Sequence, residues 1–120
     1  MIIDFNSRKI GENYPVFIIA ELSANHKQNY DLAVQTLEAM KEAGADAVKL
    51  QTFTPESMTL DSDLPWFQTR KDSIWAGQKL YDLYAKAYTP WEWHEKLQNV
   101  ATGLDLNFFL LPLIFKQSIS

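Results

Sequence analysis

The chain has 120 residues, a formal net charge of −4 and no cysteine, and 47% of its residues are hydrophobic. This length suits one small globular core, while the negative charge argues against nucleic-acid or anionic-membrane binding and the lack of cysteine excludes disulfides and thiolate metal sites. No apolar run is long enough for a signal peptide or a membrane span, so we expect a soluble cytoplasmic protein.

The first half of the chain predicts a βαβ unit. The short apolar run 16–20 is typical of a strand covered on both faces. Residues 30–43 predict a helix, because apolar residues recur about one turn apart and Gly44 suits its C-terminal end. Residues 47–52 predict the next strand. This order implies parallel pairing with a right-handed crossover.

The second half starts with a long segment, 53–77, that has no clear period but is rich in aromatic residues. A loop of this length in a compact domain is usually functional or disordered, and its aromatic residues argue against plain disorder. A short helix is expected over 78–87. The sequence TPWE at 89–92 predicts a capping box for a helix that ends near Thr102. A third strand is expected over 106–111.

Two polar side chains interrupt the strand 47–52. Lys49 and Gln51 lie two residues apart and therefore share one face. Such groups are costly inside a sheet covered on both faces, whereas in a barrel of parallel strands they line the active-site mouth. Glu21 follows the first predicted strand and would open onto the same mouth. The lysine suits a phosphate or carboxylate substrate, and a structural ion pair between Glu21 and Lys49 is the alternative.

Three stretches resemble the sialic acid synthase family: FIIAELSANH (17–26), AGADAVKLQTFTPESMTL (43–60) and IWAGQKLYDLYAKAYTPWEWH (74–94). The third resembles specifically the branch of the family that makes pseudaminic acid. The resemblance implies an α/β fold, the N-terminal part of a (β/α)8 TIM barrel. It also implies a transferase that condenses phosphoenolpyruvate with 2,4-diacetamido-2,4,6-trideoxy-L-altrose and releases phosphate. A divalent metal, Mn or Mg, would orient and polarise the sugar aldehyde.

The resemblance also assigns roles to individual residues. Lys49 and Gln51 match the family positions that contact phosphoenolpyruvate, and Glu21 matches the catalytic glutamate beside the reacting carbons. Four further residues are candidate substrate contacts: Asn25, His26, Tyr81 and Asp82. For His26 a structural hydrogen bond is the alternative. The helical spacing of apolar residues in 80–87 is also typical of a core face.

The chain departs from the family at its C-terminal end. A barrel of this type needs about 250 residues, so residues 1–120 are expected to form a partial domain that stops in the third strand. The segment 108–120 reads FFLLPLIFKQSIS. The corresponding segment in the family resembles FFSSPFD. Codons for Ser-Ser-Pro-Phe-Asp-Ile read one base out of step can give Leu-Leu-Pro-Leu-Ile-Phe, which predicts a reading-frame slip near Phe109 and an aberrant tail.

The family's metal-binding histidines lie on later strands, and His26 and His94 do not replace them. We therefore expect no metal site in this chain, no catalysis by the chain alone and low stability. Full-length relatives are expected to be homodimers. Two alternatives stay open: an N-acetylneuraminate or legionaminic acid synthase of the same family, and a non-catalytic fragment or gene remnant.

Overall fold

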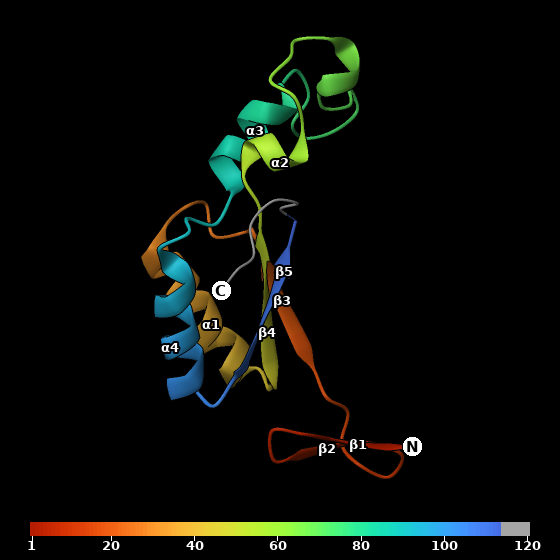
Figure 1. Cartoon of the computed structure of the whole chain (residues 1–120), viewed down its shortest axis with the longest axis vertical. Coiled ribbons are helices and arrows are strands. Elements are labelled where there is room, and N and C mark those ends of the chain that lie inside the picture. The colour runs from red at the N-terminus through yellow and green to blue at the C-terminus, as the bar shows by residue number, and fades with distance from the viewer. Residues whose placement is uncertain (114–120) are drawn as a thin grey trace.

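The structure, a computed structural model, describes residues 1–113 as two small sheets and a set of helices (Figure 1). Strands β1 and β2 form an antiparallel hairpin, and β3, β4 and β5 form a parallel sheet in that order. In chain order the elements are β1 (Ile2–Phe5), β2 (Arg8–Gly11), β3 (Ile19–Ser23), α1 (Tyr30–Glu42), β4 (Ala47–Thr52), α2 (Pro55–Met58), the 3-10 helix η1 (Pro65–Phe67), α3 (Leu80–Ala87), α4 (Trp93–Gly103) and β5 (Asn107–Pro112).

Helices α1 and α4 cover the same face of the parallel sheet (Figure 1). Helix α1 connects β3 to β4, and α4 precedes β5, so both crossovers run over one side. In a doubly wound sheet the strand order reverses and helices lie on both faces, whereas here the order β3-β4-β5 follows the chain. The predicted α/β class with parallel strands is confirmed. The described part of the sheet has one face covered by helices and one face without them.

The core lies between the covered face of the sheet and the two helices. Val48 and Leu50 of β4 are completely buried there, and Leu22 of β3 joins them. The other buried members come mainly from the helices: Ala33, Leu37, Ala45, Trp93, Leu97, Ala101 and Leu106. The predictions for the first helix and for the strand 47–52 are therefore confirmed. Gly44 follows α1 with a φ of 102°, a conformation that favours glycine.

The open face of the sheet carries the side chains that alternate with the core residues. Glu21 of β3 pairs in register with Lys49 of β4, which in turn pairs with Phe109 of β5. Gln51 lies opposite Leu111 on the same face. All of these side chains are partly or largely exposed to solvent. The two-residue period of a strand thus separates the core from the polar groups.

The first parallel strand differs from its prediction. The expected strand 16–20 begins only at Ile19 and continues to Ser23, so Glu21 lies within the strand rather than after it. Val16 is 80% exposed, and Ile18 and Ile19 are each about half exposed. The apolar run was expected to be covered on both faces, but its partner strand β4 starts at Ala47, which pairs with Ile19. Pairing, rather than apolar composition, sets where the strand begins.

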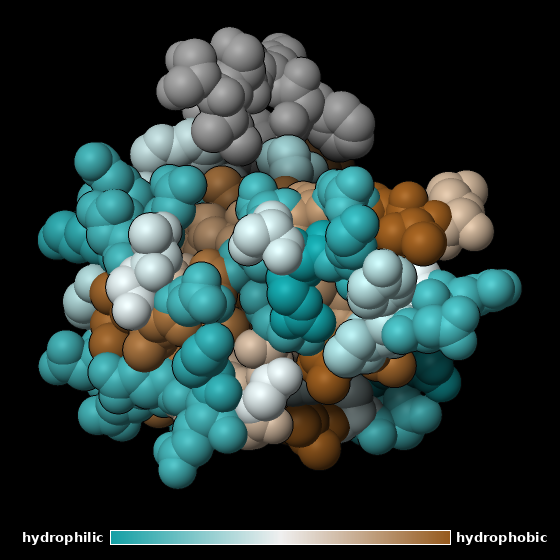
Figure 2. Space-filling model, turned by 90° about the horizontal axis from the view of Figure 1, so that it is seen from below, coloured by the Kyte–Doolittle hydropathy of each residue, from teal (hydrophilic) through white to brown (hydrophobic). Residues whose placement is uncertain are grey.

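The β1–β2 hairpin, which was not predicted from the sequence, docks near the amino ends of the parallel strands. Asn6 and Ser7 form its turn with positive φ values of 45° and 66°, as a tight hairpin turn requires. Arg8 forms an ion pair with Asp46, and the ring of Phe5 stacks on Phe109 at 5.6 Å. Figure 2 views this end and shows hydrophobic side chains at the surface among hydrophilic ones.

Residues 53–88, here called the arm, extend beyond the carboxyl ends of the strands (Figure 1). The arm contains α2, η1 and α3, and α2 packs against α3. The predicted helix 78–87 is observed as Leu80–Ala87, and much of the aromatic segment before it is irregular. The arm therefore projects from the carboxyl end of the sheet, which Gln51 of β4 approaches more closely than Lys49 does.

The capping box predicted at 89–92 is wrong. Helix α4 begins at Trp93, and Glu92 is its N-cap without a side-chain hydrogen bond. Thr89 instead turns inward, where its hydroxyl bonds to His26 at 2.7 Å. A long-range partner thus replaces the expected local one. The buried residues of α4 are Trp93, Leu97 and Ala101. The third strand spans Asn107–Pro112, one residue later than expected.

The molecule is less compact than a typical domain of its length. Its radius of gyration is 17.0 Å, whereas a compact domain of this length has about 14 Å. Its accessible surface is 8405 Å², against about 6600 Å² for a compact monomer of this mass. The open sheet face and the projecting arm both add exposed surface. Of the predicted aberrant tail, residues 108–112 belong to β5, and 114–120 lie outside the described residues.

Candidate functional site

A carboxylate and an ammonium group meet on the open face of the parallel sheet. The Lys49 Nζ atom lies 2.5 Å from the Glu21 Oε1 atom. The two residues are neighbours in the β3–β4 register, so backbone pairing fixes their side chains on one face. The structure therefore brings together two of the predicted site residues.

This ion pair is open to solvent. The Lys49 side chain is 32% exposed and that of Glu21 is 54% exposed. Ion pairs with such exposure contribute about 0–1 kcal/mol to stability, because water already solvates both charges. An ammonium group has three donors, so Lys49 can keep one contact with Glu21 and still bind an incoming anion. The pair contributes little to folding and leaves a cation accessible at the surface of the sheet.

Gln51 lies two residues beyond Lys49 on the same face and also borders a cavity of about 590 Å³. Ser23 at the end of β3 also lines this cavity, just after the pairing of β3 with β4 shifts register between Glu21 and Ser23. The lining residues come from the loop after β3, from β4 and from the arm: Ser23, Ala24, Asn25, Lys27, Gln51, Phe53, Met58, Trp75, Leu83, Tyr84, Lys86 and Ala87. Gln51 thus connects the ion pair with the cavity.

Asn25 and His26, neighbours in sequence, have different surroundings. Asn25 is exposed and lines the cavity. His26 is completely buried, its Nε2 atom bonds to Thr89 Oγ1 at 2.7 Å, and its Nδ1 atom accepts the backbone N–H of Gln28 at 3.1 Å. Because Nδ1 accepts, the ring proton lies on Nε2 and the hydroxyl of Thr89 accepts it.

Burial lowers the pKa of His26, which keeps the ring neutral. The ring also contacts Trp93 edge-on, with 5.0 Å between centroids. Both ring nitrogens have protein partners, so His26 has no free donor or acceptor for a substrate. This arrangement corresponds to the alternative considered for His26, a structural hydrogen bond that holds the loop after β3 against α4.

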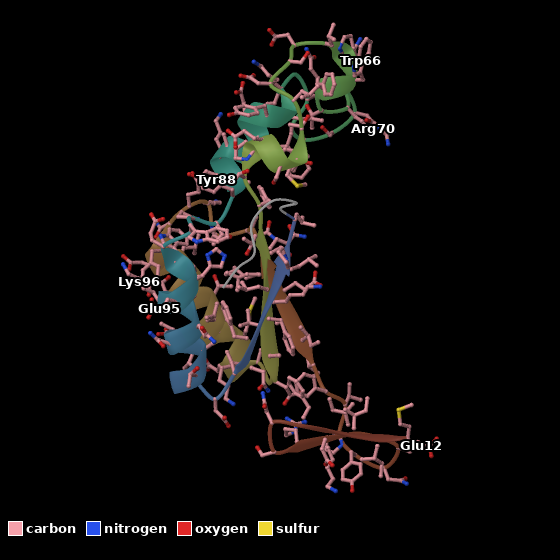
Figure 3. All side chains as sticks on the ribbon, viewed as in Figure 1. Glu12, Trp66, Arg70, Tyr88, Glu95 and Lys96 are labelled. Atoms are coloured by element: carbon pink, nitrogen blue, oxygen red, sulfur yellow. The ribbon has the colours of Figure 1, made fainter. Side chains whose placement is uncertain are left out.

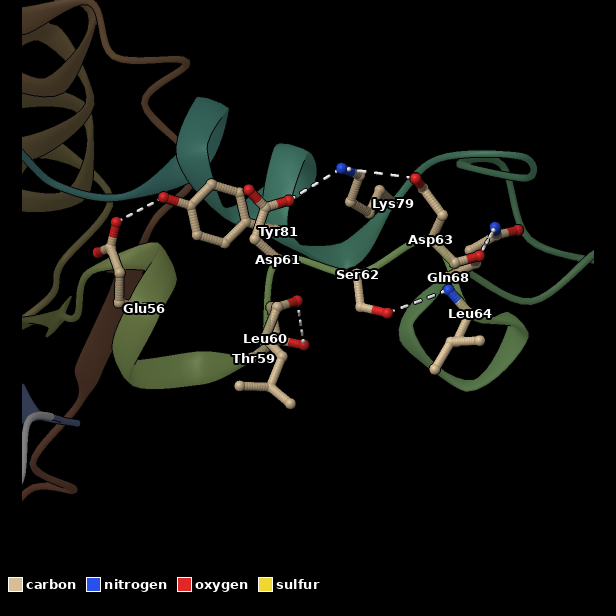
Figure 4. A network of polar contacts seen from close by, with 10 residues as sticks. All are labelled: Glu56, Thr59, Leu60, Asp61, Ser62, Asp63, Leu64, Gln68, Lys79 and Tyr81. Carbon is tan, nitrogen blue, oxygen red and sulfur yellow. Dashed lines mark hydrogen bonds and ion pairs between the residues drawn. The ribbon is translucent and has the colours of Figure 1, made fainter.

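Tyr81 and Asp82, the two candidates from the arm, do not line the cavity. The Tyr81 hydroxyl donates to Glu56 Oε1 at 2.5 Å and joins α3 to α2 (Figure 4). This hydrogen bond lowers the pKa of Glu56 and raises the pKa of Tyr81. Asp82 is exposed. In this structure both residues are separate from the Glu21–Lys49 pair, and Tyr81 has a role within the arm.

A second polar network stabilises the arm farther from the sheet. The Lys79 ammonium lies 2.9 Å from an Asp61 oxygen and 3.4 Å from an Asp63 oxygen (Figure 4). The hydrogen bond to Asp61 raises the pKa of Lys79. Gln68 donates to the Asp63 carbonyl at 2.7 Å. These contacts hold the irregular residues before η1 against the start of α3.

Sequence reasoning missed the contact between Thr52 and His94. His94 Nδ1 lies 2.9 Å from the Trp91 carbonyl, which can only accept, so this nitrogen carries the proton. The Thr52 hydroxyl therefore donates to His94 Nε2 at 2.7 Å. Together with the His26–Thr89 bond, this contact joins the end of β4 and the loop after β3 to the start of α4. The partners are 42 and 63 residues apart, so local spacing gives no signal for either bond.

Residues 1–113 do not supply a metal site. Within them no group of three or more histidine, cysteine, aspartate and glutamate side chains could hold a metal ion. Each histidine has protein partners at both ring nitrogens. The described residues therefore do not fit the divalent metal that the family resemblance implies.

The helices in this range are also too short or too polar to cross a membrane.

The model of the NeuB family matches residues 36–117. The chain belongs to the NeuB family. A pseudaminic acid synthase from Helicobacter pylori is 51% identical over 98 residues, which are 82% of this chain and 28% of that relative. An N,N'-diacetyllegionaminic acid synthase from Legionella pneumophila is 31% identical over 98 residues, 82% of this chain and 27% of that relative. This NeuB-family chain thus spans about 28% of the length of the Helicobacter relative.

A solved structure of a family relative has a similar fold. The N-acetylneuraminic acid (sialic acid) synthetase from Leptospira borgpetersenii, solved in complex with citrate, matches with a TM-score of 0.69 at 27% sequence identity. The match covers 93% of this chain and 34% of that one. The resemblance identified in the sequence is therefore confirmed at the level of family and fold class.

Proposed function

We propose that the chain forms part of the phosphoenolpyruvate site of a pseudaminic acid synthase. The observation that carries this proposal is the contact between Glu21 and Lys49 on the open face of the sheet, where Gln51 follows Lys49 two residues further along β4. The 51% identity to a pseudaminic acid synthase, against 31% to a legionaminic acid synthase, favours this branch over its family rivals.

The sheet is proposed to be a sector of a (β/α)8 barrel. Consecutive strand order and a single layer of helices are features of such a barrel, in which the face without helices points inward. Active sites of these barrels lie at the carboxyl ends of the strands. Glu21, Lys49 and Gln51 would then point into the barrel, and the arm would lie beside its mouth.

In the proposed reaction C3 of phosphoenolpyruvate forms a bond to the aldehyde carbon of 2,4-diacetamido-2,4,6-trideoxy-L-altrose. Water adds at C2, the C–O bond to phosphate breaks, and the aldehyde oxygen takes up a proton. The products are pseudaminic acid and inorganic phosphate. The ammonium of Lys49 binds the anionic donor, and the Gln51 amide donates a hydrogen bond to it. Glu21 orients the water or the sugar and accepts a proton from the water.

Several parts of this assignment rest on the family resemblance alone. These are the divalent metal and homodimerisation of the full-length enzyme, and they stay predictions. The cytoplasmic location, which was inferred from the lack of a long apolar run, also stays a prediction. The chain alone is expected to release no phosphate from phosphoenolpyruvate and sugar, because it spans 28% of the Helicobacter relative and its described residues do not supply a metal site. The alternative in which Glu21 and Lys49 form only a structural ion pair predicts that Lys49 is dispensable for activity of the full-length enzyme.

A chimeric enzyme tests the proposal. The aligned 98-residue segment of this chain replaces its counterpart in the Helicobacter pylori synthase, and phosphate release is measured with both substrates. The chimera should be active, and Lys49→Ala should reduce its rate at least about a hundredfold, as loss of a positioned donor does. Lys71→Ala, an exposed lysine in the arm, should have no effect. Equal activity of the two variants would favour the structural pair, and activity only with N-acetylmannosamine would favour the N-acetylneuraminate alternative.

A further inference from the structure

The side chain of His94 links the start of α4 to the end of β4. His94 is the second residue of the helix and is partly buried. The two residues after it, Glu95 and Lys96, are exposed on the side of α4 away from the sheet (Figure 3). The ring donates from Nδ1 to the Trp91 carbonyl at 2.9 Å and accepts the Thr52 hydroxyl at Nε2 at 2.7 Å. The first bond fixes the tautomer, which makes His94 an acceptor for Thr52.

Thr52 is the last residue of β4 and comes directly after Gln51. It is 1% exposed, so its hydroxyl would be costly to leave without a partner. Successive side chains of a strand point to opposite faces, so Thr52 faces the helices while Gln51 lies on the open face with Lys49. A bond that holds the Thr52 side chain against α4 therefore also constrains the Gln51 side chain on the other face.

Strand pairing constrains this end of β4 on one edge only. The pairing of β4 with β3 ends at Leu50, opposite Ser23, whereas its pairing with β5 continues to Thr52. In the part of the chain that the structure describes, Gln51 therefore has a paired strand on one side. The bond to His94 supplies a second constraint, and it acts on the residue next to Gln51.

We propose that His94 is a positioning residue for the phosphoenolpyruvate site, because its bond to Thr52 holds the Gln51 amide on the same face as the Lys49 ammonium. This inference rests on the proposed function, in which Gln51 and Lys49 bind the anionic donor. His94 lies on the helix side of the strand and does not touch that donor. Its contribution is to reduce the entropy that is lost when Gln51 is ordered by the bound donor.

The hydrogen bond from Gln51 to the donor sets the upper limit of the effect. Removal of a hydrogen bond to a charged group weakens binding by at least about tenfold, and this is the loss expected for Gln51→Ala. A residue that acts through Gln51 cannot cause a larger loss. A replacement of His94 that breaks the bond to Thr52 should therefore weaken binding by about three- to tenfold.

Two amide replacements of His94 separate positioning from packing. Glutamine is long enough to place its amide oxygen near the position of Nε2, where it can accept the Thr52 hydroxyl. Asparagine ends near the position of Nδ1, so it can keep the bond to the Trp91 carbonyl but cannot reach Thr52. His94→Gln should keep the affinity for phosphoenolpyruvate within about twofold of wild type, and His94→Asn should reduce it about three- to tenfold.

Both variants are made in the 120-residue chain, and phosphoenolpyruvate is titrated into the isotopically labelled protein by NMR. The side-chain amide resonances of Gln51 should already shift in His94→Asn before the ligand is added, and His94→Gln should restore them. In a Gln51→Ala background, His94→Asn should cause no further loss of affinity, because a positioning residue acts only through the group that it positions.

Thr89→Val is the control for general destabilisation. It breaks the buried bond between Thr89 and His26, which is of the same kind but is not adjacent to Gln51. The affinity for phosphoenolpyruvate should therefore stay unchanged in Thr89→Val. The folded fraction of each variant is measured from the same spectra.

The outcomes separate this inference from the proposed function. If the wild-type chain binds phosphoenolpyruvate and Lys49→Ala does not, the donor site stands. The positioning role is then rejected by wild-type affinity in His94→Asn, by equal losses in His94→Asn and His94→Gln, or by a further loss in the Gln51→Ala background. If the wild-type chain does not bind phosphoenolpyruvate, or binds it equally well after Lys49→Ala, the proposed function fails and this inference fails with it.

Discussion

Replacement of Thr89 by valine should destabilise the chain by leaving one buried donor without a partner. The hydroxyl of Thr89 accepts the Nε2 proton of His26 at 2.7 Å, and both residues are at most 1% exposed. Valine has nearly the same shape as threonine, so it leaves no cavity and removes only the acceptor. A buried polar group that loses its partner costs about 1–3 kcal/mol. We therefore expect the free energy of unfolding to fall by about 2 kcal/mol.

Urea denaturation followed by tryptophan fluorescence measures this loss, since Trp93 contacts the His26 ring. Thr102→Val is the matched control, because the Thr102 hydroxyl is exposed and bonds only within α4, to the Gln98 carbonyl. It should change the free energy of unfolding by less than about 0.5 kcal/mol. Equal effects of the two variants, or an unchanged Thr89→Val protein, would refute the argument from buried hydrogen bonding.

Three further predictions concern stability and the hairpin. Burial lowers the pKa of His26 in the folded chain. Below about pH 6.5 the unfolded chain therefore binds more protons than the folded chain does. The free energy of unfolding should fall as the pH drops through this range, by at most about 1.4 kcal/mol per pH unit. NMR titration of the His26 ring checks the assignment, and a ring that titrates as in a free peptide would contradict it. Leu97→Ala should cost about 2–5 kcal/mol in urea denaturation, because Leu97 is completely buried, whereas the exposed Leu60→Ala should cost less than about 0.5 kcal/mol. Arg8→Ala should remove the ion pair with Asp46 and speed amide exchange across β1 and β2 while exchange in β4 stays slow; slow exchange in the hairpin would show that other contacts hold it.

Local sequence patterns were sufficient to predict α1, β4 and the shared face of Lys49 and Gln51. In β4 the two-residue period directs Val48 and Leu50 into the core and Lys49 and Gln51 to the open face. The contact between Glu21 and Lys49 follows from parallel pairing of neighbouring strands. The predicted meeting of these two residues is therefore observed, while their chemical roles stay a prediction.

Long-range hydrogen bonds account for the features that the sequence did not predict. The signature at 89–92 suggested a local cap, but Thr89 bonds to a histidine 63 residues earlier in the chain. His26 is likewise a buried structural group, because Thr89 and Gln28 occupy both of its ring nitrogens. Tyr81 bonds to Glu56 across the arm rather than facing the cavity. In each case the partner lies on an element whose position the local pattern does not determine.

The hairpin and the cavity also depend on how segments assemble. The turn at Asn6 and Ser7 carried a weak local signal, but the docking of β1 and β2 requires Asp46 and Phe109, which lie far along the chain. The cavity likewise forms only where residues of the arm meet the loop after β3 and the end of β4. Such contacts depend on topology and can be recognised only once the strands are placed.

Titration of the isotopically labelled chain with phosphoenolpyruvate tests the central claim most directly. The account predicts chemical-shift changes concentrated at Glu21, Lys49 and Gln51, which Lys49→Ala abolishes and the exposed control Lys71→Ala preserves. Changes that are absent, that spread evenly over the surface lysines, or that survive Lys49→Ala would contradict the claim that this sheet face binds the anionic donor.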